Sequence, residues 1–304
     1  MSENIVNEYV RTVENKQEEI MVQGGLVLEG GGMRGLYTAG ILDYFLDKGL
    51  FFKNCYGVSA GAIQCCSYLS KQRGRAARIY IKYMPDKRYA SFGNLIKEGY
   101  YFGKEFSLKT IPYELEPYDF DTYNQLGCNF IAVATDCKTG EAAYHKIGDM
   151  RKDIEMDKLW ATCSLPLISR MVEIDGGEYL DGGVTDSIPV EKAIEEENDK
   201  VVVILTRDAS YRKKPASMMG MFKVKYRKYP NLIKAMEIRH ERYNRTVELI
   251  EKLEADGRIY VIRPKAEIEV GRLEKDTAKL TALYETGYKE AEEYYDGLKM
   301  YLGL

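Results

Sequence analysis

The chain has 304 residues, and its 44 lysines and arginines nearly balance 47 aspartates and glutamates, for a net charge of −3. Hydrophobic residues make up 45% of the sequence, which suits the core of one large domain or two small ones. The charge balance argues against a nucleic-acid-binding protein, which usually carries a basic surplus. The apolar content argues against a disordered chain.

The chain lacks the usual signals for export, membrane insertion and metal binding. Five glutamates occupy the first nineteen residues, where a secretory signal has a basic start and an apolar stretch. No later stretch approaches the ~18 apolar residues of a membrane-spanning helix. The six cysteines lack the short paired spacings of metal sites, and no acidic loop of the calcium-binding kind occurs. We therefore predict a cytoplasmic protein with reduced, packing cysteines and no metal or other cofactor.

Apolar patterns alternate between strand and helix along the chain. We predict a polar leader over residues 1–23 and a single domain over 24–304, with loops and short helices over 80–121. Within this domain we predict strands over 25–28, 51–58, 129–135, 201–206 and 259–262, and helices over 36–49 and 60–69. This alternation predicts an α/β fold with a mostly parallel central sheet and helices on both faces.

A glycine-rich loop separates the first predicted strand from the first helix. It consists of Gly30, Gly31, Gly32, Met33, Arg34 and Gly35. A dinucleotide site would also need a carboxylate ~20 residues further on, and residues 54–59 contain none. This absence disfavours a nucleotide-binding protein. Backbone N–H groups that converge at a helix N-terminus stabilise a phosphate or a developing oxyanion equally well.

The second predicted strand leads into Gly57-Val58-Ser59-Ala60-Gly61, a G-x-S-x-G sequence followed by an apolar helix. In a nucleophile elbow the serine lies on a tight strand-to-helix turn, and larger residues in place of Gly57 and Gly61 would collide with the strand and helix. We therefore predict Ser59 as a nucleophile. The alternative is a buried glycine-rich turn with a capping serine.

A nucleophilic serine needs a base. The two histidines are His145, in an exposed strand or loop, and His240, in a charged helical stretch; only His240 follows the order of an α/β-hydrolase triad. The other candidates are two Asp-Gly-Gly sequences. Asp175 lies between two short extended runs and predicts a hairpin turn. Asp181, followed by Gly182 and Gly183, ends a predicted strand and is better placed to reach a serine, unless it is a second turn aspartate.

Residues 207–245 are strongly basic and interleaved with methionine and aromatic side chains. Two interpretations stay open. The segment is either a lid or docking surface at an anionic membrane, placed over the Ser59 pocket, or a solvated pair of helices whose cations pair with nearby acids. We favour the second.

The three ordered motifs resemble the patatin-like phospholipases and lipid acyl hydrolases. The match rests on the glycine loop 30–35, the elbow 57–61 and the acid motif Asp181-Gly182-Gly183. Ser164-Leu165-Pro166 is similar to the family's segment before the acid, and the tail around residues 263–276 looks like that of a bacterial subgroup. The third residue of the acid motif, Gly183, stands where many members have alanine. The resemblance implies a three-layer patatin-like fold.

The resemblance also implies a Ser-Asp dyad without histidine. In it Ser59 attacks an ester carbonyl, Asp181 takes the proton, and the N–H groups of residues 30–33 hold the oxyanion. Arg34 orients the loop or adds positive potential, or else forms a salt bridge to a surface carboxylate; Glu29 receives no role. We expect residues 80–121 to line the substrate pocket. The implied function is hydrolysis of lipid carboxylic esters, with acyl transfer or lipid binding with little activity as alternatives.

Overall fold

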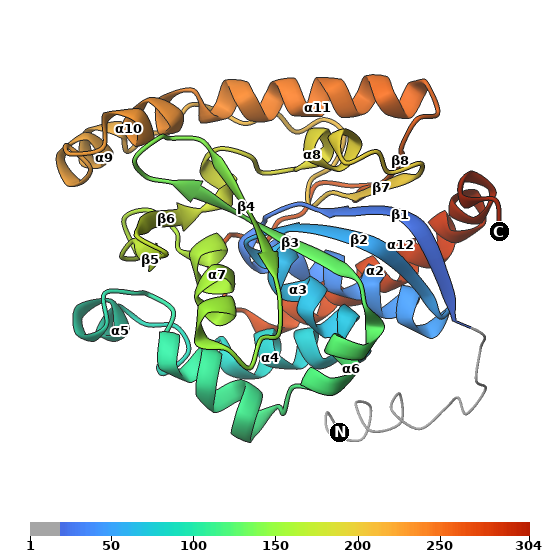
Figure 1. Cartoon of the computed structure of the whole chain (residues 1–304), viewed down its shortest axis with the longest axis horizontal. Helices are drawn as coiled ribbons and strands as arrows, with labels where there is room; N and C mark the ends of the chain where they lie inside the picture. Colours follow the sequence, from blue (N-terminus) through green and yellow to red (C-terminus); the bar gives the residue numbers. More distant parts are fainter. Residues whose placement is uncertain (1–18) are drawn as a thin grey trace.

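The computed structural model describes residues 19–304, which form a mixed eight-stranded sheet covered by helices on both faces (Figure 1). The strand order is β5-β6-β3-β2-β1-β7-β8, and β4 pairs with β3. The strands are β1 (Ile20–Leu28), β2 (Leu50–Val58), β3 (Asn129–Asp136), β4 (Ala142–Ile147), β5 (Val172–Ile174), β6 (Gly177–Asp181), β7 (Val201–Ile204) and β8 (Tyr260–Ile262). The predicted α/β class is confirmed.

The centre of the sheet is parallel and one side is antiparallel. β1 pairs in parallel with β2 and β7, as do β2 with β3 and β7 with β8. β3 is antiparallel to β4 and β6, and β5 to β6. Since β3 runs antiparallel to β6, the C-terminal end of β6 lies beside Ala134 of β3, so Asp181 is carried into the interior of the sheet.

Alternating side chains of the central strands enter two different cores. Leu26 and Leu28 pack with α2 (Gly35–Asp47), α3 (Ala60–Leu69), α4 (Arg75–Tyr83) and α12 (Thr277–Leu302). Val27, between them, packs under α8 (Val190–Glu195) and α11 (Arg239–Ala255). Figure 1 shows α8 and α11 above the sheet and α2, α3 and α4 below it. The predicted three-layer arrangement is confirmed.

Most predicted elements differ from the observed ones only at their ends. The first strand begins at Ile20 instead of residue 25, so it includes the last part of the predicted leader. Residues 1–18 of that leader lie outside the described residues. The structure adds α4, β4, α7 (Asp153–Cys163) and the long helix α12, none of which was predicted from the sequence.

Residues 80–121 form short helices and loops, as predicted. They include α5 (Phe92–Lys97) and a π-helix (Phe106–Leu115) that contains Pro112, and α6 (Phe120–Leu126) follows. The basic segment 207–245 contains α9 (Met219–Lys225), α10 (Pro230–Glu237) and the start of α11. Arg212, Lys223 and Arg242 of this segment pair with glutamates, which agrees with the interpretation that we favoured for it.

Candidate active site

Ser59 occupies a strained turn between β2 and α3. Its φ is 51° and its ψ is −121°, a conformation that costs energy for any residue with a Cβ. The Ser59 backbone N–H donates to Oγ1 of Thr162 at 2.8 Å, and the Thr162 hydroxyl in turn donates to the Val133 carbonyl. These bonds fasten the turn to α7 and β3.

The two glycines of the elbow allow the strand and helix to approach each other. A Cβ at Gly57 would lie 2.6 Å from Cα of Ala62, and one at Gly61 would lie 2.5 Å from the Leu28 carbonyl oxygen. Both distances are too short for a side chain. The geometry is therefore that of a nucleophile elbow, as the sequence predicts.

Asp181 ends β6 and is 4% exposed. Its Oδ1 accepts the Gly183 N–H at 2.8 Å, while its buried Oδ2 has no hydrogen-bond partner in residues 19–304. Burial raises the pKa of this carboxyl, and the neighbouring Ser59 side chain lowers it in part. The two side chains are thus close without a full hydrogen bond, as is common before substrate binds.

The other candidate bases lie elsewhere. Asp175 has a φ of 49° and Gly176 a φ of 80° in the turn between β5 and β6, so the predicted hairpin is confirmed. His145 lies on β4 and its ring packs edge-on against Tyr179. His240, at the start of α11, contacts the Glu237 carbonyl and the Glu241 carboxylate.

The glycine loop forms a 3₁₀ turn over Gly32–Arg34 directly before α2. Two of the four N–H groups expected to hold an oxyanion are already occupied. The Gly30 N–H donates to the Ser187 carbonyl at 3.3 Å, and the Met33 N–H donates to the Arg272 carbonyl at 3.2 Å. The N–H groups of Gly31 and Gly32 donate to no other group in the part of the chain that the structure describes. Gly32, with a φ of 60°, lines the same pocket as Ser59.

Arg34 and Glu29 are buried on either side of these glycines. Arg34 donates through Nη1 to the Val270 carbonyl at 3.2 Å, so the alternative of a surface salt bridge is wrong. Burial and the charge of Arg207 lower the Arg34 pKa to about 10. The Glu29 carboxylate accepts hydrogen bonds from the N–H and hydroxyl of Thr206 and from the Tyr243 hydroxyl. It therefore ties β1 to the end of β7 and to α11.

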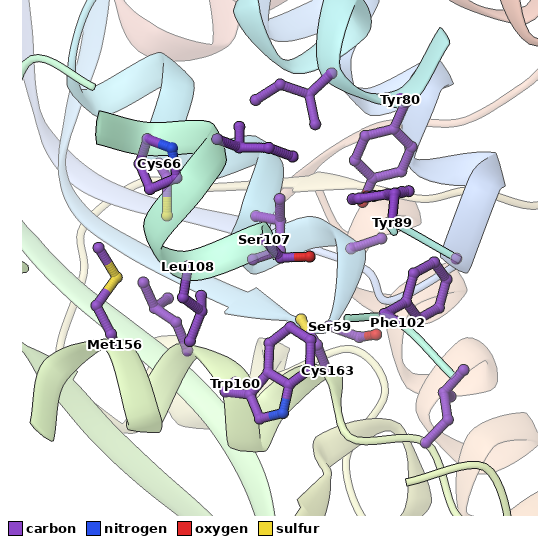
Figure 2. Close-up of a pocket in the computed structure, with 18 of the residues that line it drawn as sticks. Ser59, Cys66, Tyr80, Tyr89, Phe102, Ser107, Leu108, Met156, Trp160 and Cys163 are labelled. Atoms are coloured by element: carbon purple, nitrogen blue, oxygen red, sulfur yellow. The ribbon is translucent and has the colours of Figure 1, made fainter. Parts of the chain in front are cut away.

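An apolar pocket opens beside Ser59 (Figure 2). Residues 80–121 contribute much of its wall, as expected, through Tyr89, Phe102, Ser107, Leu108 and Ile111. Helix α7 contributes the opposite side, and in Figure 2 Met156, Trp160 and Cys163 project from it toward the space near Ser59. Figure 2 also shows Tyr80 and Cys66 on the side of the pocket away from Trp160. Such a lining suits a hydrocarbon chain.

Sequence reasoning missed three residues around the site. Thr162 supports the Ser59 turn, Arg239 donates to the Gly183 carbonyl, and Arg272 lines the pocket. Thr162 and Arg239 lie in helices without a motif of their own. Arg272 lies in the tail segment that the resemblance singled out, so that segment was the available signal.

The sequence of the chain is similar to those of known proteins. A family model described as patatin-like phospholipase matches residues 26–194, more than half of the chain, and a domain of unknown function matches residues 229–303. The uncharacterised protein YjjU of Escherichia coli K12 is 29% identical over 186 residues, which cover 60% of this chain and 51% of that protein. A probable lipid hydrolase, 463L of Invertebrate iridescent virus 6, is 25% identical over 213 residues, covering 62% of this chain and 71% of the relative.

Among solved structures, VipD from Legionella pneumophila aligns with a TM-score of 0.45 and 14% identity, over 90% of this chain and 67% of VipD. The family model covers the glycine loop, the elbow and the acid motif together. The chain therefore belongs to the patatin-like phospholipase family.

Proposed function

We propose that the protein hydrolyses carboxylic esters of lipids, as a phospholipase A or lipid acyl hydrolase, with Ser59 as nucleophile and Asp181 as base. One observation carries the proposal. A buried carboxylate oxygen without a partner, Oδ2 of Asp181, lies beside a serine in a strained elbow that opens into an apolar pocket. A buried polar atom without a hydrogen-bond partner lowers stability, so a functional role explains why it is retained.

In the proposed first step, Ser59 Oγ attacks the ester carbonyl while its proton passes to Asp181. The carbonyl oxygen becomes an oxyanion, held by the free N–H groups of Gly31 and Gly32. The tetrahedral intermediate collapses to an acyl ester of Ser59. The departing alcohol takes the proton from Asp181, which restores the carboxylate.

Water completes the reaction. It attacks the acyl carbonyl, gives a proton to Asp181 and forms a second tetrahedral intermediate in the same oxyanion site. Collapse then releases the fatty acid, and the proton returns to Ser59 Oγ. The apolar pocket holds the acyl chain during both acylation and deacylation, since its wall is mainly aliphatic and aromatic.

Acyl transfer is the nearest alternative, because an acceptor alcohol could replace water at the same acyl-serine. The viral relative is named as a probable lipid hydrolase, which favours water as the acceptor. A lipid-binding protein with little activity is disfavoured because elbow, acid and glycine loop are all present. An increase in acyl-glycerol product over free acid when glycerol is added would favour transfer.

Ion pairs account for Arg212, Lys223 and Arg242 of segment 207–245 but not for the exposed apolar side chains on and beside α9, for which we propose peripheral contact with a membrane. No residue of α9 or α10 lines the pocket, which favours a docking surface over a lid for this part of the segment. On and beside α9, Met218, Met221 and Val224 are 45%, 54% and 74% exposed, next to Lys223 and Lys225. Co-sedimentation should increase with anionic lipid and fall with salt; binding that ignores both would refute this contact.

The catalytic proposal is tested with short and long p-nitrophenyl esters and a phospholipid. Ser59→Ala and Asp181→Asn should each lower kcat/KM by about 10³-fold or more. Asp175→Asn is the matched control, because it changes an aspartate of the same Asp-Gly-Gly type in a surface turn, and His240→Ala should also stay near wild type. Loss of activity in His240→Ala with Asp181→Asn unaffected would instead establish a histidine base.

A further inference from the structure

Five cations surround the glycine loop and the acid motif. The Arg272 carbonyl accepts the Met33 N–H, and the Arg239 side chain donates to the Gly183 carbonyl, two residues from Asp181. Arg34 lies in the loop itself. Lys213 and Arg207 lie near the same loop and stack on aromatic rings. The Lys213 ammonium lies 4.0 Å from the centre of the Tyr243 ring, and the Arg207 guanidinium lies 4.3 Å from the centre of the Tyr211 ring.

Shared contacts hold these side chains together. The Tyr211 and Tyr243 rings are 5.9 Å apart, and the Tyr243 hydroxyl donates to Glu29, which precedes the glycines. The Lys213 backbone N–H donates to Asn244 of α11. The cluster is therefore built from the loop after β7, the start of α11 and the segment before α12, around one end of the catalytic machinery.

None of the five cations forms an ion pair within residues 19–304. By contrast, two neighbouring arginines do form ion pairs: Arg212 lies 2.8 Å from Glu251, and Arg242 lies 3.3 Å from Glu141. The Nε atoms of Arg34 and Arg207 are buried without a hydrogen-bond partner there. Arg34 is 6% exposed, so its guanidinium is separated from water as well.

The positive charges act on one another. Burial lowers the pKa of Lys213 well below its ordinary range, and the charges of Arg239 and Arg272 lower it further. Burial and Arg272 lower the Arg239 pKa to about 10. Glu29 offsets part of this charge by raising the pKa of Arg34 and Lys213, and Asp181 does so by raising the pKa of Arg239, but these two carboxylates face five cations. Uncompensated charge in a partly buried site is costly, and a bound anion removes the cost.

We propose that Arg34, Arg207, Lys213, Arg239 and Arg272 form an anion-binding subsite beside Ser59, which takes a phosphate-type group on the alcohol side of the ester. This inference rests on the proposed function. Arginine forks and a lysine suit the oxygens of a phosphate. Four of the five cations lie outside the patatin-like match, and two, Arg239 and Arg272, lie in the domain of unknown function. That domain thus supplies part of the substrate site.

A selectivity measurement tests the subsite. Dihexanoyl-phosphatidylglycerol and dihexanoylglycerol, each below its aggregation threshold, share acyl chains and differ in the anionic phosphoglycerol head group. In Lys213→Gln and Arg272→Gln, the ratio of kcat/KM for the phosphorylated ester to that for the neutral one should fall about tenfold or more. Arg212→Gln is the matched control, because it removes an adjacent, ion-paired cation and should keep the ratio. An unchanged ratio in both cluster variants would overturn the inference, as would equal losses on the two esters.

Binding separates this inference from the catalytic proposal and distinguishes two sources of phosphate. In a Ser59→Ala background, calorimetry with inorganic phosphate and with dihexanoyl-phosphatidylglycerol should show binding that weakens at least fivefold in the cluster variants and not in Arg212→Gln. If this holds while wild type hydrolyses neither ester, the catalytic proposal fails and the subsite stands. If the lipid cannot displace bound phosphate, the subsite binds free phosphate and not the lipid head group. Absence of cluster-dependent binding by both ligands would overturn it.

Discussion

At the scale of single residues, the proposed chemistry depends on the environment of Asp181. Burial raises the pKa of its carboxyl, whereas Ser59, the Gly183 N–H and the charges of Arg239 and Arg272 lower it. The net effect is upward, so the carboxylate accepts a proton more readily than an exposed aspartate does. A base must be ionised to act, which means that the raised pKa limits activity on the acid side.

We therefore expect kcat/KM for a neutral ester to fall on acidification with a midpoint above the ordinary aspartate value of about 3.9. Removal of a positive charge disfavours the carboxylate, so Arg272→Gln should move this midpoint to higher pH. Arg212→Gln, which removes a charge paired with Glu251, should leave it in place. A pH profile of each variant measures this shift, and a shift to lower pH in Arg272→Gln would contradict it.

The sequence identifies Ser59 and Asp181 as candidates because each lies in a short motif whose glycines are required by local backbone geometry. Thr162, Arg239 and Arg272 could not be identified in this way, since their roles arise from contacts between distant segments. The glycine loop was predicted only in part. Its position between strand and helix follows from the local sequence. The Ser187 and Arg272 carbonyls, which accept two of its N–H groups, come from distant parts of the chain.

At the scale of elements, the elbow between β2 and α3 depends on α7. The Thr162 side chain accepts the Ser59 N–H and donates to Val133 of β3, so one hydroxyl joins three elements. The patterns that predicted β2, α3 and β3 are apolar runs bounded by glycine. Helix α7 was missed although Met156, Leu159, Trp160 and Cys163 recur at helical spacing, so its pattern was present in the sequence. β4 was missed because only its last residue, Ile147, is buried, which leaves no clear apolar alternation.

Thr162→Val keeps the shape of this side chain and removes both hydrogen bonds. It leaves the Ser59 N–H without an acceptor, so we expect the free energy of unfolding to fall by about 1–3 kcal/mol. The Ser59 turn should also loosen, with a loss of kcat of about tenfold. Thr162→Ser retains the hydroxyl and should recover most of the activity. Denaturant titration and kinetics on one ester measure both effects; wild-type kcat in Thr162→Val would rule out this support.

At the scale of the whole molecule, the patatin-like region and the C-terminal segment share one core. Helix α12 packs directly on α2, which follows the glycine loop. A Cβ at Gly287 would lie 2.1 Å from the Tyr37 carbonyl oxygen, and one at Gly40 would lie 2.2 Å from that of Tyr284. The α/β class could be predicted from alternating patterns. This helix contact could not, because the two glycines lie far apart in sequence.

We expect Gly287→Ala to separate α12 from α2 and to lower the free energy of unfolding by about 1–3 kcal/mol. Gly220→Ala in α9 is the control, because a Cβ there meets nothing within 4 Å, and it should be neutral or stabilise by up to ~1 kcal/mol. Activity and secondary structure should be lost at the same denaturant concentration in each protein. Equal stability of the two variants, or activity that is lost well before the fold, would show that the C-terminal segment is not coupled to the site.

Covalent capture of the Ser59 hydroxyl is the most direct measurement of the proposed chemistry. A fluorophosphonate probe should label wild type once, on the peptide that contains Ser59, as read by mass spectrometry after digestion. Ser59→Ala should take no label, Asp181→Asn should react at least 100-fold more slowly, and Asp175→Asn should react at the wild-type rate. Labelling of a different serine, or of Ser59 at an undiminished rate in Asp181→Asn, would contradict the proposal that Asp181 activates Ser59.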